Sequence, residues 1–318
     1  THYYNDELIQ FTAFTGGVTR REHLYFLEES RDWAGFWDHY ATYGKNIDHM
    51  YELAQEQGDK SLEAIALTFK VLFFSNMTDM FGSVPYEEAF SGRKVGGTLT
   101  PKFNTQKEIY QFMFADLEAA NEIYATNPVF LNPTMDGMYG GKMELWRKFN
   151  NSLYLRLLCR VSGRSEMNVG TKMTEILNNT TKYPVFTSNA DNATVKFTGT
   201  DPYISNFGTT SESEFTSSGR KLTRQLIGMT VLTDQSGNQV YVDPRLPIIG
   251  KKNNIVSVNP KNIWIGTVSG CSEQERSIVD KGTSWLNYKV FCRKDAPATY
   301  MDYAEIKFIF AEAALKGF

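Results

Sequence analysis

All four histidines lie within the first 49 residues, and none belongs to an HExxH or HxxEH motif of the kind that binds catalytic zinc. His39 and His49 lie ten positions apart in one expected helix, which places them about 80° apart around its axis. A zinc site completed by Asp38 or Asp48 is the functional alternative. Exposed histidines and aspartates are the ordinary content of a helix surface, so the sequence favours no metal site.

The carboxylates also lack a catalytic arrangement. Acidic pairs stand at residues 28–29 and 87–88, but a glycosidase needs two carboxylates that face each other about 5 to 10 Å apart, whereas adjacent side chains point apart. Residues 234–238 (DQSGN) resemble the start of a calcium loop but are not followed by its bidentate glutamate, so a hairpin turn is favoured. The chain has no GxSxG elbow and no Walker-type loop. The residues therefore contain no motif for catalysis, which would have to come from carboxylates that the fold brings together, and no cofactor is expected.

Composition narrows the class further. The 318 residues carry a net charge of −3, which offers no broad positive field for nucleic acid. The 22 Phe, 17 Tyr and 5 Trp fit either a helix-packed core or a surface where rings meet a ligand. Cys159, Cys271 and Cys292 form no CxxC motif; free buried thiols are favoured, and a bridge between the last two stays open. No apolar run approaches the roughly 20 residues of a spanning helix.

Helical periodicity dominates the first half of the chain and returns at its end. A helix with Asp32 as cap is expected to stop at Gly58, and Ser61 is expected to cap a second helix to residue 80, whose apolar residues form one stripe. The short link predicts an antiparallel hairpin. Thr105 and Glu108 have capping-box spacing. Further helices are expected over residues 105–124, 144–161, 169–178 and 303–318.

The remaining segment, residues 180–301, is rich in Ser, Thr, Asn and Gly and predicts loops with short strands, including a hairpin that pairs residues 230–233 with 239–242. The last helix is apolar almost all round, and such a helix is normally covered on most sides. Because the sequence opens at Thr1 without Met and stops at Phe318, we expect a missing leader and a chain that continues, or a partner that supplies the cover.

Four separated stretches together resemble the SusD/RagB family, in particular its SusD-like subgroup of starch- and glycan-binding outer-membrane lipoproteins from Bacteroidetes-type bacteria. They are residues 73–90, which end in DMFGSVPYEEAF; residues 145–161 (LWRKFNNSLYLRLLCRV); the corner at 243–247 (DPRLP); and residues 303–318 (YAEIKFIFAEAALKGF). The upstream lipobox cysteine, the first helices and the helices that follow residue 318 in the family are absent, so the resemblance implies a chain truncated at both ends.

The resemblance implies a mainly α fold, with a tetratricopeptide-like helical repeat scaffold, an irregular loop-rich lobe and a few short β-hairpins. Residues 1–318 would form a single domain, with the scaffold mainly at 32–179 and 302–318 and the ligand lobe mainly at 180–301. It further implies a protein held on the cell surface by an N-terminal lipid anchor. Such a protein binds oligosaccharides without cleaving them and delivers them to a SusC-like TonB-dependent transporter.

Sugar binding on such a surface implies aromatic rings that stack on pyranose faces, completed by polar side chains. The candidate ligand-binding residues are those in loop context: Arg20, Tyr25, Trp33, Tyr203, Trp264 and Trp285. Burial in the core is the alternative for each ring, and Trp37 and Trp146 are assigned to the core because they continue helical stripes. The competing functions are capture of peptides or another nutrient by a member of the same family, a cytosolic helical-repeat scaffold that binds protein segments, and a glycoside hydrolase.

Overall fold

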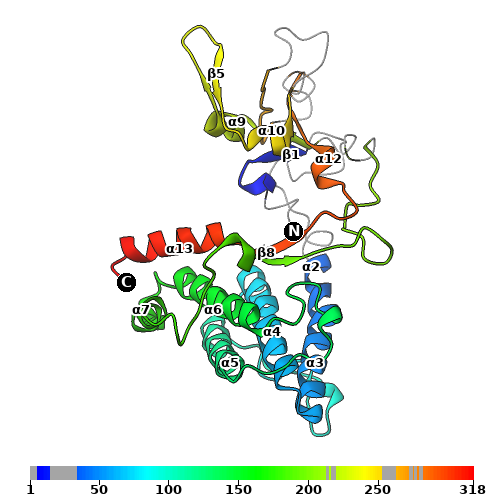
Figure 1. Ribbon diagram of the computed structural model, residues 1–318, viewed down its shortest axis with the longest axis vertical. Helices are drawn as coiled ribbons and strands as arrows, with labels where there is room; N and C mark the ends of the chain where they lie inside the picture. The colour runs from blue at the N-terminus through cyan, green and yellow to red at the C-terminus, as the bar shows by residue number, and fades with distance from the viewer. Residues whose placement is uncertain are drawn as a thin grey trace. The chain divides into compact units, whose positions relative to one another are not determined.

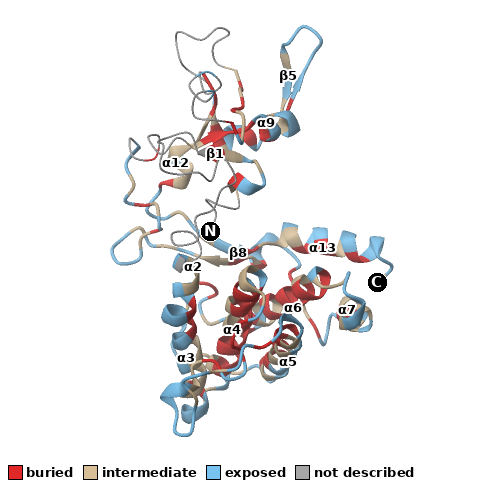
Figure 2. Ribbon diagram, turned by 180° about the vertical axis from the view of Figure 1, so that it is seen from behind, coloured by how far each residue is buried: buried red, intermediate tan, exposed pale blue. Residues whose placement is uncertain are grey.

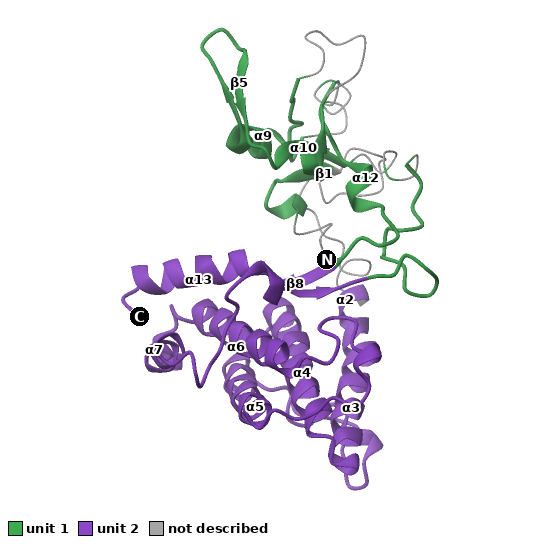
Figure 3. Cartoon of the chain, in the orientation of Figure 1, with its two compact units in different colours: residues 1–32, 197–297 green, residues 33–196, 298–318 purple. Residues whose placement is uncertain are grey.

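The protein is described by a computed structural model that covers residues 6–14, 34–212, 215, 220–252, 263–271, 275, 278 and 282–318. The chain divides into two compact units (Figure 3). We call Trp33–Lys196 with Ala298–Phe318 the helical unit, and Thr1–Asp32 with Phe197–Pro297 the sheet unit. The limits expected for the scaffold and the lobe, at residues 179/180 and 301/302, differ from the limits of these units, and the expected single domain stays a prediction.

The fold is mainly α with few short strands, as predicted. The helical unit contains α2 (Ala34–His39), the π-turn η3 (Tyr40–Gly44), α3 (Lys45–Gln57), α4 (Lys60–Phe81), α5 (Gln106–Ala125), α6 (Met143–Arg160), α7 (Gly170–Asn178) and α13 (Tyr303–Leu315). Short 3₁₀ turns are η4 (Ser91–Arg93), η5 (Pro133–Met135), η6 (Ser165–Met167) and η7 (Asn189–Asp191), and β2 (Ala193–Val195) pairs with β8 (Ala298–Met301). Each of α3–α6 packs on the next one along the chain (Figure 1).

The caps explain where the first long helices stop and start. The helix that ends with α3 stops at Gly58, whose φ of +67° suits glycine, as predicted. The expected Ser61 cap of α4 is wrong. Asp59 caps this helix instead, because its carboxylate accepts the Leu62 N–H at 3.0 Å, and Ser61 sits in the first turn and donates its hydroxyl to Asp59. The expected Asp32 cap lies outside the described residues.

Helix α4 forms the centre of the helical unit. Its buried residues lie on most sides of the helix rather than on one stripe, because α3, α5 and α6 all pack against it (Figure 2). This corrects the single-stripe prediction. Among the described residues α4 alone is long and apolar enough to span a membrane by length and composition, which the sequence analysis did not expect, and 61% of its most apolar window is buried. Its apolar character therefore matches its place in the core.

The later helices follow the sequence closely. Thr105 and Glu108 form the predicted capping box at the start of α5: the hydroxyl accepts the Glu108 N–H, and the carboxylate accepts the Thr105 N–H. Trp146 is buried in the core cluster and Trp37 packs against it, as predicted. Helix α13 buries only Ile306, Ile309 and Ala313 against the described residues, and Phe308 and Leu315 stay 77% and 88% exposed. The described residues thus cover one face of α13 instead of most sides.

Buried amides connect the central helices. Asn150 of α6 donates to the Leu117 carbonyl of α5 at 2.9 Å and accepts from the Thr68 hydroxyl of α4 at 2.9 Å. Its neighbour Asn151 donates to Asn121 Oδ1 at 3.0 Å and to a carbonyl of the segment after α7. All three asparagines are at most 1% exposed. Because each buried amide is hydrogen-bonded, these polar groups hold three helices in one register.

The sheet unit is built on a four-stranded antiparallel sheet in the order β1-β3-β7-β6, with β1 (Thr12–Phe14), β3 (Arg220–Leu222), β6 (Gly250–Lys251) and β7 (Trp285–Leu286). The predicted hairpin is confirmed as β4 (Val231–Thr233) and β5 (Gln239–Val242). Short helices are α9 (Arg224–Thr230), α10 (Leu246–Ile249) and α12 (Tyr288–Phe291). The three cysteines are free and buried, as favoured. Burial raises the pKa of Cys159 to about 11.

We expect Asn150→Leu to lower the free energy of unfolding by about 2 to 4 kcal/mol, because it leaves the Thr68 hydroxyl and the Leu117 carbonyl buried without this partner. Urea unfolding followed by far-UV circular dichroism measures the change. Asn76→Ala is the control, because Asn76 is an exposed asparagine of α4 whose amide donates only to its own helix. Equal stability of the two variants would contradict a structural role for the amide network.

Candidate functional site

Three of the predicted ligand-binding residues, Arg20, Tyr25 and Trp33, lie outside the described residues. The other three lie in the sheet unit, and the structure gives each a different environment.

Trp264 belongs to the small core of the sheet unit. Its side chain is 3% exposed and packs with Leu222, Leu226, Val231 and Leu246. Its backbone is clamped by the amide of Gln239, which accepts the Trp264 N–H at 3.0 Å and donates to its carbonyl at 2.6 Å. The sequence left burial in the core open as the alternative to ligand binding for each ring. The low exposure of Trp264 favours this alternative.

Trp285 is half-buried and carries a cation on its ring. It lies opposite Lys221 in the β3–β7 pair, and the Lys221 ammonium is 4.2 Å from the centroid of the indole ring. An ammonium at that distance interacts favourably with the ring quadrupole. Because Lys221 is itself buried, one face of the ring is engaged within the protein.

Tyr203 presents the most accessible ring of the three, at 63% exposed. Its N–H donates to the Thr200 carbonyl at 2.8 Å, and its carbonyl accepts the Gly199 N–H at 3.2 Å. The loop is anchored two residues later, where Ser205 donates its N–H to the Lys294 carbonyl and its hydroxyl to the Arg293 carbonyl. An exposed aromatic side chain thus projects from a hydrogen-bonded turn.

A cluster that the sequence analysis missed joins this loop to the sheet. The guanidinium carbon of Arg220 in β3 lies 5.4 Å from the ring centroid of Phe207 and 5.5 Å from that of Phe215. The ring of Tyr288 in α12 lies 5.9 Å from Phe215. No local pattern predicts the cluster, because the contact between Phe215 and Tyr288 joins residues 73 positions apart. Tyr203 and Trp285 do not stack on each other. The Tyr203 loop reaches Arg220 of β3 through Phe207, and β3 pairs with β7, the strand that carries Trp285.

The alternatives that the sequence raised for chemistry find no support among the described residues. No group of three or more His, Cys, Asp or Glu side chains there could hold a metal ion. Asp234 accepts the N–H groups of Ser236 and Asn238, which is the hairpin turn expected for this segment. Glu88 accepts the Lys102 N–H at 2.7 Å and therefore supports the local loop.

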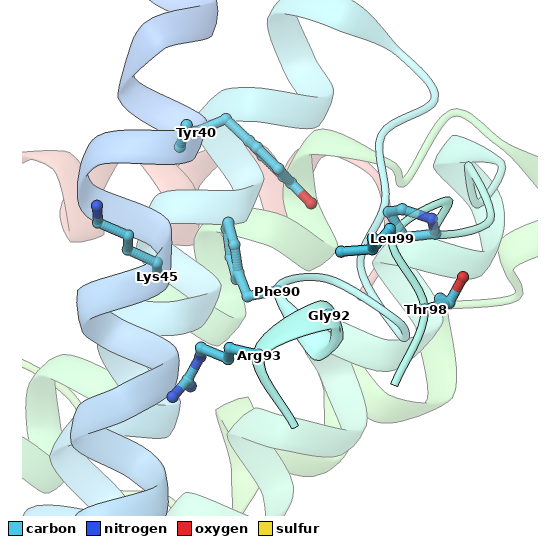
Figure 4. Close-up of a pocket in the computed structure, with 9 residues that line it drawn as sticks. Tyr40, Lys45, Phe90, Gly92, Arg93, Thr98 and Leu99 are labelled. Carbon is cyan, nitrogen blue, oxygen red and sulfur yellow. The ribbon is translucent and has the colours of Figure 1, made fainter. Parts of the chain in front are cut away.

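The helical unit contains an open cavity of about 380 Å³. It is lined by Tyr40, Ala41, Lys45, Phe90, Gly92, Arg93, Thr98, Leu99 and Pro101. One wall is the π-turn η3 with the start of α3, and the other is the loop that follows α4 (Figure 4). The Tyr40 and Phe90 rings meet between these walls, with centroids 4.8 Å apart.

Ion pairs fasten the loop to the helix. Arg93 lies 2.5 Å from both Asp48 and Glu52, and Lys94 lies 2.7 Å from Glu52. Burial alone would raise the pKa of Glu52, but the charges and hydrogen bonds of Lys94 and Arg93 hold it below its usual value. Burial and the charge of Asp48 raise the pKa of Tyr40, whose hydroxyl donates to the Pro85 carbonyl at 3.2 Å. Arg93 and the Tyr40 hydroxyl, two polar groups that line the cavity, thus already have partners within the protein.

Comparison with known protein families matches residues 1–318 to the SusD-like family, described as starch-binding and associating with the outer membrane. The chain belongs to this SusD-like family. The resemblance inferred from the four stretches is therefore confirmed over the whole chain. The description is that of binding proteins associated with the outer membrane. No curated protein matches the chain by sequence.

Solved structures share the SusD-like fold. A SusD homologue from Bacteroides fragilis superposes with a TM-score of 0.77 at 21% identity, over 98% of this chain and 64% of its own. A chitin-binding protein gives 0.78 at 23%, over 99% and 65%. A SusD homologue from Parabacteroides distasonis gives 0.77 at 20%, over 98% and 63%. The chain thus spans about 64% of the length of these proteins, and at such identities the likeness concerns the fold.

We expect Trp264→Ala to destabilise the sheet unit of this SusD-like chain by about 3 to 5 kcal/mol, because it removes the largest side chain of a small core. Trp264→Phe should cost less, because much of the volume remains. Chemical unfolding followed by tryptophan fluorescence compares the two variants with the parent protein. A Trp264→Ala variant with unchanged stability and reduced ligand affinity would instead make Trp264 a ligand-binding residue.

Proposed function

We propose that this SusD-like protein captures oligosaccharides at the cell surface without cleaving them. It would be held on the outer membrane by an N-terminal lipid anchor and would deliver the ligand to a SusC-like TonB-dependent transporter. The family description supports binding at the outer membrane, and the fold shared with a chitin-binding protein supports a carbohydrate ligand. The three parts of the proposal, ligand, anchor and partner, can be tested separately.

The observation that carries the ligand proposal is the exposed ring of Tyr203 on its hydrogen-bonded turn. Pyranose rings offer CH-rich faces that stack on aromatic side chains, and a side chain on a backbone already fixed by hydrogen bonds loses less conformational entropy on binding than one on a free loop. The same loop is tied to Arg293 and Lys294 and, through Phe207, to Arg220. Tyr203 thus projects from a loop that is anchored to the backbone of two basic residues, and sugar recognition combines an aromatic platform with polar side chains of that kind.

We expect Tyr203→Ala to weaken oligosaccharide binding about 3- to 10-fold, which corresponds to the loss of one aromatic stacking contact. Isothermal titration calorimetry against soluble malto-, chito- and xylo-oligosaccharides measures the effect. Tyr203→Phe should bind like the parent protein, because it keeps the ring. Tyr241→Ala is the matched control, because Tyr241 is a 51% exposed tyrosine on the hairpin of the same unit.

Two results would contradict the ligand proposal. One is unchanged affinity of a folded Tyr203→Ala variant for the oligosaccharide that the parent protein binds, and the other is binding of peptides with no binding across the glycan panel. The same incubations should release no reducing ends, whereas an increase in reducing sugar would identify a hydrolase.

The transporter proposal predicts a stable complex. The full-length protein, co-expressed with the TonB-dependent transporter encoded beside its gene, should elute together with it in size-exclusion chromatography after detergent extraction. A SusD-like protein from a different gene pair serves as the control and should elute separately. Separate elution of the cognate pair would contradict this partner without affecting the ligand proposal.

A further inference from the structure

Two costly backbone conformations converge on the cavity of the helical unit. The first is the π-turn η3, which interrupts the helix between α2 and α3 and supplies Tyr40 and Ala41. The second is Phe90, whose φ of +59° lies in the left-handed region that bulky residues rarely adopt. Both conformations cost stability, and such features collect at functional sites. Their meeting on one cavity is the observation that calls for an explanation.

Glycine residues allow close contacts in both walls of the cavity. Gly44 closes the π-turn, and a Cβ there would lie 2.5 Å from the Phe90 ring, so the ring packs directly on the turn. In the loop, a Cβ on Gly97 would lie 1.8 Å from the Ser91 carbonyl oxygen. Glycine therefore allows the loop to fold tightly on itself, and the Arg93 ion pairs hold it against α3. The cavity is a built feature with two positioned walls.

The chemistry of the lining argues against a sugar. The Tyr40 hydroxyl donates a hydrogen bond to the Pro85 carbonyl, and the Thr98 hydroxyl lies 3.3 Å from the Thr100 hydroxyl. Arg93 is neutralised by two carboxylates. The surface that remains is provided mainly by the rings of Tyr40 and Phe90 with Leu99 and Pro101. A sugar needs several hydrogen-bonding groups, whereas this surface suits a large apolar side chain.

A cationic side chain and exposed apolar side chains lie beside the cavity. Among the described residues Lys45 has no ion-pair partner; it lines the cavity, and its ammonium points away from Phe90 (Figure 4). Leu99 is 88% exposed beside the cavity, and Val95 of the same loop is fully exposed. The apolar surface thus extends past an open cavity. An extended chain covers such a surface, whereas a small ligand is mostly enclosed by its site.

We propose that this cavity docks an extended segment of another protein, which inserts one large apolar side chain between Tyr40, Phe90 and Leu99 and places a neighbouring carboxylate on Lys45. The proposal is independent of the glycan site, because it concerns the helical unit and uses none of the rings proposed to bind sugar.

Selection from a random 15-residue peptide library displayed on phage, against the full chain, tests the proposal. The enriched peptides should carry Phe, Leu, Ile, Met or Trp next to Asp or Glu. A synthetic, fluorescently labelled peptide from this set then gives the affinity by fluorescence anisotropy. Leu99→Glu should weaken its binding at least 10-fold, and Lys45→Glu should weaken it about 10-fold. Exchange of the acidic residue of the peptide for Lys should restore binding to the Lys45→Glu variant.

Val129→Glu is the matched control and should leave peptide binding unchanged, because Val129 is an exposed apolar residue in another loop of the helical unit. Tyr203→Ala should also leave it unchanged. Circular dichroism verifies that each variant is folded. The proposal is overturned if no peptide is enriched, if folded Leu99→Glu and Lys45→Glu variants bind like the parent protein, or if an oligosaccharide of the glycan panel displaces the peptide.

Discussion

The amide network of Asn121, Asn150 and Asn151 is the constraint on which the helical unit depends. An apolar core alone allows helices to rotate and slide, because the hydrophobic effect has no direction. A buried amide has direction: each N–H and carbonyl needs a partner, and an unpaired one costs about 1 to 3 kcal/mol. Asn150 meets this requirement only when α4, α5 and α6 adopt the observed register. Specificity of packing thus comes from polar groups within an apolar core.

The same network extends from the helices to the segment that follows α7. Asn151 and Asn121 reach the carbonyls of Pro184 and Lys182, and Arg147 donates to both Asn121 and Lys182. A segment with no regular secondary structure is therefore fixed by side chains of α5 and α6. This matters for the fold because the chain then continues into β2, which pairs with β8 just before α13. One polar network thereby positions both the core helices and the chain that leaves them.

Features determined by neighbouring residues could be predicted from the sequence. The capping box at Thr105 and Glu108, the stop at Gly58 and the β4–β5 hairpin each depend on residues within a few positions of one another. The cap of α4 was assigned to Ser61 instead of Asp59 because two good capping residues stand close together. The amide network could not be predicted, since its bonds between different elements join residues 26 to 82 positions apart. Sequence patterns cover only neighbouring residues, so they cannot indicate hydrogen bonds between residues so far apart.

The candidate site shows the same division. Composition and loop context selected Tyr203 and Trp264 equally, but burial separates them, and burial depends on the packing of distant segments. Gln239 of the hairpin holds Trp264 in the core, whereas Tyr203 stays outside on a turn whose hydrogen bonds are local. A ring in a loop is therefore only a candidate until the contacts of its neighbours are known. The Arg220 cluster could not be predicted because its aromatic members, Phe207, Phe215 and Tyr288, come from separate parts of the chain.

The segment after α4 links the family resemblance to the cavity. Gly82 ends the helix with a φ of +70°, and Asn104 then holds the chain by accepting the Tyr86 and Glu87 N–H groups. Tyr86 is buried and donates its hydroxyl to Asp116 of α5. These contacts leave the chain little freedom by the time it reaches Phe90. The left-handed conformation of Phe90 is therefore sustained by the turn before it and by the π-turn opposite, so the stretch that best marks the family also shapes the cavity that we propose as a docking site.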